Sequence, residues 1–128
     1  MPADISRRGV LAYGAGTLLA GAGAQGQTSA MYGLIGKMKA VPGRRDDLAA
    51  ILLAGVSAMP GCLSYIVARD PLDADALWVT EVWESAASHE ASLSLPAVRE
   101  AITRGRPLIA SMGDYHATEP VGGYGLKG

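Results

Sequence analysis

The chain has 128 residues, with 11 Lys and Arg against 12 Asp and Glu, and a formal net charge of −1 at pH 7. This length suggests one domain, and a hydrophobic content of 49% supports a packed core and argues against intrinsic disorder. No basic stripe is present, which argues against nucleic acid as a partner. The single cysteine, Cys62, excludes an internal disulfide, and no Cys/His cluster indicates a metal site.

Residues 1–30 resemble a twin-arginine-type export signal followed by a linker. Arg7 and Arg8 precede a weakly apolar run, residues 10–24, which is diluted by glycine and ends in an A-x-A cleavage pattern. The run is shorter than the roughly 20 apolar residues that a membrane-spanning helix needs. We therefore expect a periplasmic or secreted protein without a stable membrane anchor after signal cleavage.

The first predicted elements are a strand and a helix. Residues 31–40 are apolar with late lysines and predict a strand. Asp46 and Asp47 suit a helix N-terminus, and Pro60-Gly61 is a stop signal. Between them the apolar side chains recur at helical spacing, which predicts a helix that continues to Met59.

Two strands and a turn follow. Residues 62–69 predict a strand with Tyr65 on one face, and residues 70–75, DPLDAD, predict a turn. Residues 77–84, LWVTEVWE, contain both tryptophans, two valines and a threonine, which favours a strand.

The second helical region is predicted to be split. Ser85 is an N-cap candidate for a short helix that ends before Pro96. A further short helix, marked by Val98, Ala101 and Ile102, is interrupted by Gly105 and Pro107. An apolar turn is then expected to continue through Leu108, Ile109 and Met112 before a last strand at residues 114–119. Residues 120–128 are a Gly-rich tail for which no regular structure is expected.

The predicted order, β-α-β-β-α-β, is the ferredoxin-like split βαβ arrangement of the α+β class, within a domain at residues 31–119. Helices on one face of a four-stranded sheet leave the other face bare. A small domain can cover such a face with a second copy of itself, so we expect a homodimer.

Strand alternation and helical spacing predict one pocket. Glu81 and Trp83 share a face of the third strand, and His89 lies on the helix that returns over that strand. Tyr65 lies on the neighbouring strand. Each residue also has a plain structural reading: a core tryptophan, an ion-paired carboxylate, an exposed histidine and a packing tyrosine.

Three segments, PGCLSYIVARD, LWVTEVWES and SHEASLSLPAV, resemble the antibiotic biosynthesis monooxygenase family, including its quinol monooxygenase-like branch. The resemblance implies a dimeric ferredoxin-like α/β-barrel. Several members of this family oxidise phenolic or polycyclic aromatic substrates with dioxygen and without flavin, haem or metal. Others bind ligands without established catalysis.

The resemblance implies an activity and a role for each candidate residue. It predicts a monooxygenase that needs no cofactor and acts on a small aromatic substrate, with His89 and Glu81 as the catalytic residues. His89 would be the base, since an imidazole titrates near neutral pH. Trp83 and Tyr65 would bind the substrate ring. The alternative is an exported dimeric ligand-binding or stress-related module without catalysis.

The haem-degrading branch of this fold is a poor match. That branch uses an asparagine on the first strand, the strand tryptophan, and a histidine on the later helix. Trp83 matches the tryptophan, but Gly36 lies near the asparagine position and Leu93 occupies the histidine position.

Overall fold

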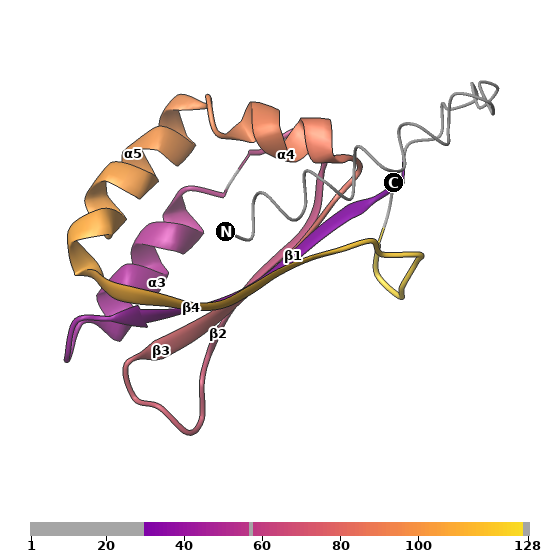
Figure 1. Ribbon diagram of the computed structural model, residues 1–128. Helices are drawn as coiled ribbons and strands as arrows, with labels where there is room; N and C mark the ends of the chain where they lie inside the picture. Colours follow the sequence, from indigo (N-terminus) through magenta and orange to yellow (C-terminus); the bar gives the residue numbers. More distant parts are fainter. Residues whose placement is uncertain (1–29, 57, 127–128) are drawn as a thin grey trace, which may run out of the picture. The chain divides into compact units, whose positions relative to one another are not determined.

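The structure, a computed structural model, describes residues 30–56 and 58–126 (Figure 1). The expected export signal lies outside the described residues, apart from Ala30 at its end. The strands are β1 (Tyr32–Ala40), β2 (Cys62–Arg69), β3 (Ala76–Trp83) and β4 (Ile109–Thr118). The helices are α3 (Arg45–Ala54), α4 (Ala86–Ser92) and α5 (Pro96–Gly105), and a short 3-10 helix, η1 (Arg106–Leu108), leads into β4.

The four described strands form an antiparallel sheet in the order β2-β3-β1-β4, and the three α-helices lie over one of its faces (Figure 1). This arrangement confirms the predicted α+β fold of the ferredoxin-like type, and it is consistent with a dimeric α/β-barrel. Within the described residues, no helix combines the length and the hydrophobicity needed to cross a membrane.

The core lies where α3 packs against the sheet. Leu48 of α3 is fully buried against Leu77 of β3 and Ala40 of β1. Because strand side chains alternate between the two faces, the face that carries Leu77 also carries Glu81 and Trp83. The helices therefore cover the face of β3 that carries Glu81 and Trp83, which the predicted pocket requires.

The turn between β2 and β3 is held by aspartate side chains. Asp70 accepts hydrogen bonds from the backbone N–H of Leu72, at 2.8 Å, and from Nε1 of Trp78, at 3.0 Å. These donors, with Lys37 at 3.4 Å, hold the pKa of Asp70 below its usual value. Asp73 accepts a hydrogen bond from the backbone N–H two residues further on. Such local bonds are typical of tight turns and keep the two strands in register.

Helix α3 is shorter than predicted, because it ends at Ala54 and not at Met59. Helix α5 lies close to this end of α3. At Gly55 a Cβ atom would come within 2.7 Å of Cβ of Ala101, so α5 approaches the backbone of this turn too closely for any residue but glycine. Gly55 and Val56 form the turn that follows the helix, and their backbone N–H groups bond to carbonyl oxygens of its last residues.

The last strand is longer than predicted. An apolar turn was expected through Met112, but β4 begins at Ile109, which pairs with Ala40 of β1. Met112 pairs with Met38, and two register shifts interrupt the ladder. Hydrogen bonding to β1 therefore extends the strand through residues whose own pattern indicated a turn. Residues 119–126 form no helix or strand.

The face of the sheet away from the helices is partly apolar. Ile35, Thr80 and Ile66 are directly paired across β1, β3 and β2 and share this face. Ile66 is 54% exposed. The homodimer expected on this face stays a prediction.

Candidate active site

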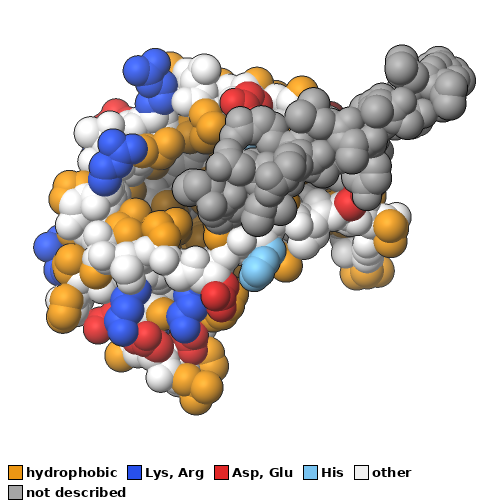
Figure 2. Space-filling model, viewed as in Figure 1, with side chains coloured by type: hydrophobic (Ala, Val, Ile, Leu, Met, Phe, Trp, Pro, Cys, Tyr) orange, Lys and Arg blue, Asp and Glu red, His pale blue; other side chains and the backbone are white. Residues whose placement is uncertain are grey.

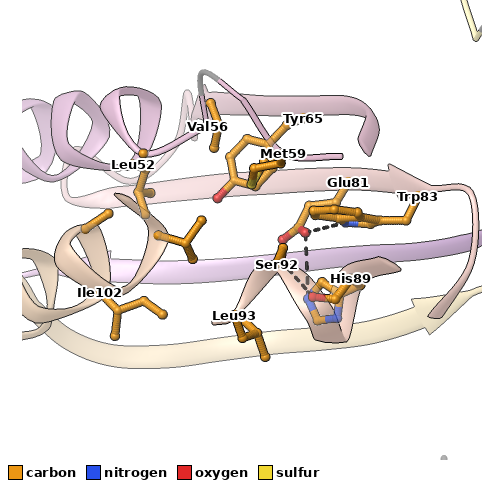
Figure 3. A pocket seen from close by; sticks show the side chains of 13 residues that line it. Leu52, Val56, Met59, Tyr65, Glu81, Trp83, His89, Ser92, Leu93 and Ile102 are labelled. Atoms are coloured by element: carbon orange, nitrogen blue, oxygen red, sulfur yellow. Dashed lines mark hydrogen bonds and ion pairs between the residues drawn. The ribbon is translucent and has the colours of Figure 1, made fainter. Parts of the chain in front are cut away.

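A pocket lies between the helical layer and the sheet, where Figure 2 shows the surface hollowed and lined with hydrophobic side chains. Its volume is about 160 Å³, and the 13 residues that line it are shown in Figure 3. Four of them carry side-chain polar groups that can contact a ligand: Tyr65, Glu81, His89 and Ser92. Nearly all the others are apolar: Leu52, Gly55, Val56, Met59, Trp83, Leu93, Val98, Ala101 and Ile102. Few polar groups in an apolar concave wall are typical of a small-molecule site.

Strand β3 supplies the floor of the pocket with Glu81 and Trp83. These residues are two apart and therefore share a face. Trp83 is 1% exposed, and its Nε1 donates a hydrogen bond of 2.8 Å to Oε1 of Glu81 (Figure 3). The indole thus orients the carboxylate and satisfies one of its oxygens.

Helix α4 places His89 over this pair. Ser85 caps the helix, as predicted, because its hydroxyl oxygen accepts a hydrogen bond of 3.1 Å from the backbone N–H of Ser88. Nε2 of His89 lies 4.0 Å from Oε1 of Glu81. This distance allows an ion pair when the imidazole is protonated, but it is too long for a hydrogen bond.

Two aromatic rings flank the imidazole of His89. The Trp83 ring meets it edge-on, with centroids 5.4 Å apart and planes at 74°. The Tyr32 ring of β1 is also 5.4 Å away, tilted at 40°. Since Tyr32 pairs directly with Trp83 across the sheet, β1 and β3 together fix the place of the imidazole. Tyr32 was missed from the sequence, although the alternation of the first strand could have indicated it.

Ser92 was also missed. Its side chain is nearly inaccessible, and its Oγ donates a hydrogen bond of 2.6 Å to the backbone oxygen of His89. Because the hydroxyl hydrogen is donated to that backbone oxygen, the lone pairs of Oγ can accept a hydrogen bond from a ligand in the pocket. The spacing of three residues from His89 on one short helix is the signal that could have identified it.

The electrostatics of the pocket are set by burial. Burial raises the pKa of Glu81, while the Trp83 hydrogen bond and the nearby imidazole of His89 lower it less strongly. Burial, followed by the charge of Glu81, raises the pKa of Tyr65 far above its usual value. Tyr65 therefore stays protonated at neutral pH, and its hydroxyl points into the pocket on the side of Leu52 (Figure 3).

The structure thus brings all four candidate residues into one pocket: Tyr65, Glu81, Trp83 and His89. Trp83 is both a core residue and a pocket wall, and His89 is partly buried and not a surface histidine. Their catalytic and substrate-binding roles stay predictions. In the part of the chain that the structure describes, no three His, Cys, Asp or Glu side chains are grouped as they would be around a metal ion.

Gly36 and Leu93, the two positions that depart from the haem-degrading pattern, have surroundings that disfavour haem degradation. A Cβ at Gly36 would lie 2.9 Å from the ring of Tyr115, so an asparagine side chain would not fit without displacing that ring. Leu93, at the histidine position, lines the pocket with an apolar side chain.

Comparison with known proteins gives a consistent result. The sequence model of the family described as "Antibiotic biosynthesis monooxygenase" matches residues 31–104. The chain is 65% identical to a candidate antibiotic biosynthesis monooxygenase from Chloroflexus aurantiacus J-10-fl, over 76% of this chain and 99% of that one, with a TM-score of 0.75. No curated protein matches it.

More distant solved structures share the fold alone. A protein from Pseudomonas aeruginosa is 24% identical over 74% of this chain and 98% of its own, with a TM-score of 0.64. A candidate monooxygenase of the same description from Caulobacter crescentus CB15 is 18% identical over 74% of this chain and 93% of its own, with a TM-score of 0.67.

Proposed function

The chain belongs to the antibiotic biosynthesis monooxygenase family, and from this premise we propose that it is a cofactor-independent monooxygenase that oxidises a quinol or another phenolic or polycyclic aromatic substrate with dioxygen. One observation carries the proposal. Glu81 and His89 lie beside each other, against Trp83, at one end of an otherwise apolar pocket.

The first step is removal of a phenolic proton by Nε2 of His89. The imidazolium that forms is stabilised by the carboxylate of Glu81, which lies 4.0 Å away. The substrate is left as an electron-rich anion between the side chains of Trp83 and Tyr65. The apolar walls exclude water, which strengthens the interaction between the imidazolium and the carboxylate.

The anion then passes one electron to dioxygen, which gives superoxide and a substrate radical. Recombination forms a C–O bond on the ring. The O–O bond then breaks, so that one oxygen atom stays on the substrate and the other leaves as water with two hydrogens from the substrate. A hydroquinone would thus give a hydroxyquinone and water. His89 can return its proton to the departing oxygen.

An exported ligand-binding or stress-related module without catalysis is the second candidate. The distance between Nε2 of His89 and Oε1 of Glu81 favours it, because 4.0 Å is too long for the hydrogen bond by which this carboxylate would hold the imidazole as a base. The apolar lining suits binding of an aromatic ligand whether or not a reaction follows.

Oxygen uptake distinguishes the two candidates. Protein dialysed against a metal chelator is mixed with a panel of quinols, catechols and anthrones, and dissolved oxygen is followed. We expect uptake with at least one phenolic substrate and incorporation of one atom from labelled dioxygen into the product. Tight binding of a panel member without oxygen uptake would support the second candidate.

We also propose that the mature protein is an exported homodimer. The apolar character of the uncovered sheet face, with Ile66 more than half exposed, supports pairing with a second copy. The pattern of Arg7 and Arg8 before a weakly apolar run supports export in the folded state. Export would place the pocket outside the cytoplasm.

A further inference from the structure

We propose that the pocket selects uncharged phenolic rings and rejects rings that carry a carboxylate. This inference rests on the proposed function for the identity of the ligand as a phenol. The charges around the cavity support this selection, which is measured by binding and not by turnover.

The size of the cavity limits what is enclosed. Its volume, about 160 Å³, is close to the roughly 150 Å³ of an engineered apolar cavity that binds one benzene. One ring therefore fills it. A charged substituent on that ring then lies against the mainly apolar side chains at the edge of the cavity.

The lining offers no cation for such a substituent. Among the 13 lining residues there is no Lys or Arg, and His89 is the one lining side chain that can carry a positive charge. The carboxylate of Glu81 lies 4.0 Å from that imidazole. A carboxylate on the ring would therefore compete with Glu81 for a single cation, and an unpaired buried charge is costly.

The proposed reaction strengthens the selection. After proton transfer the pocket holds two anions, Glu81 and the phenolate, and one cation, His89. A ring carboxylate would add a third anion in the same cavity. Tyr65 offers it one neutral hydrogen bond, since burial keeps that hydroxyl protonated, and one such bond does not offset the desolvation of a full charge.

The test compares two ligands that have the same ring and nearly the same size. They are 2,5-dihydroxybenzamide, which is uncharged, and 2,5-dihydroxybenzoate, which is an anion at neutral pH. Their dissociation constants for the wild-type protein are measured anaerobically by titration calorimetry. We expect the amide to bind at least about tenfold more tightly than the benzoate.

Two variants test whether the charges in the pocket cause the difference in affinity between the two ligands. Glu81→Gln removes the resident anion, so the ratio of the two dissociation constants should fall. Ile102→Lys adds a cation at a lining position that is 39% exposed, where a long side chain can be accommodated, so the benzoate should gain affinity. The matched control is Leu53→Lys, at a half-exposed position of α3 outside the pocket, and its ratio should equal that of the wild type.

Equal binding of the two ligands to the wild type overturns the inference, and so does failure of the amide to bind at all. Unchanged selectivity in both Glu81→Gln and Ile102→Lys also overturns it. These outcomes are separate from the fate of the proposed function. Selective binding without oxygen uptake would leave the inference standing and reject the monooxygenase, whereas oxygen uptake together with equal binding of both ligands would do the reverse.

Discussion

The indole Nε1 of Trp83 donates a hydrogen bond of 2.8 Å to Oε1 of Glu81, from two positions further along the same face of β3. A buried carboxylate without a partner would be strongly destabilising. The tryptophan gives Glu81 one partner, and His89 supplies a second when it is protonated. The three side chains thus act as one unit, and each has a different expected effect when it is replaced.

Replacing Glu81 by Gln should stabilise the folded protein near neutral pH. Burial raises the pKa of Glu81 in the folded state. The folded protein therefore loses stability as the pH rises from the carboxyl pKa of the unfolded chain through the carboxyl pKa of the folded protein. Gln lacks that charge but keeps an oxygen for the indole N–H of Trp83. We expect a gain of about 0.5–2 kcal/mol near neutral pH, which disappears as the pH falls toward about 4.

Thermal or urea unfolding at several pH values measures this difference between Glu81→Gln and the wild type. A variant that is less stable at neutral pH would mean that the contacts of Glu81 with Trp83 and His89 outweigh its burial.

Replacing His89 by Ala should affect turnover far more than folding. A general base contributes roughly 100- to 10,000-fold to the rate, equivalent to about 3–5 kcal/mol. The measurement is oxygen uptake with the best substrate, with thermal unfolding recorded alongside. The matched control is His116→Ala, because His116 is exposed on β4 and does not line the pocket. Retention of the full rate by His89→Ala would reject His89 as the base.

Replacing Trp83 by Ala should lower the free energy of unfolding by about 3–5 kcal/mol, whatever the role of Trp83 in catalysis. Its side chain is almost completely buried, so truncation opens a cavity next to the pocket. Trp78→Ala is the control, because Trp78 is only partly buried on the other face of β3. This substitution should lower the free energy of unfolding by a smaller amount. Chemical denaturation measures both, and equal losses would contradict this difference in burial.

Replacing Ile66 by Asp should convert the expected homodimer into a monomer. Ile66 lies on the uncovered face of the sheet, where a charge buried in an interface between two copies would be unpaired. Light scattering at micromolar concentration measures the mass of both proteins. Leu53→Asp on the helical side is the control and should stay dimeric. A wild-type protein that is already a monomer would refute the homodimer.

Export should require Arg7 and Arg8. Replacing both with Lys keeps the charge but removes the guanidinium pair that resembles the export motif. The precursor should then accumulate in the cytoplasm of a Gram-negative host, as measured by fractionation. Normal arrival of the doubly substituted precursor in the periplasm would reject the twin-arginine interpretation.

The sequence by itself determined the elements whose pattern is local. β2 was predicted at residues 62–69 and is found there, and β3 is displaced by one residue, because alternating apolar side chains mark a strand independently of its partners. The same alternation predicted that Glu81 and Trp83 share a face. Helical spacing then predicted His89 above them, because a helix that directly follows a strand packs back over that strand.

The tertiary structure decided what depends on residues distant in the sequence. Strand β4 begins where Ile109 pairs with Ala40. In the pocket, the packing of Tyr32 against His89 depends on the register between β1 and β3. No local pattern encodes such contacts, because their energy comes from packing and hydrogen bonding between segments that only the folded chain brings together.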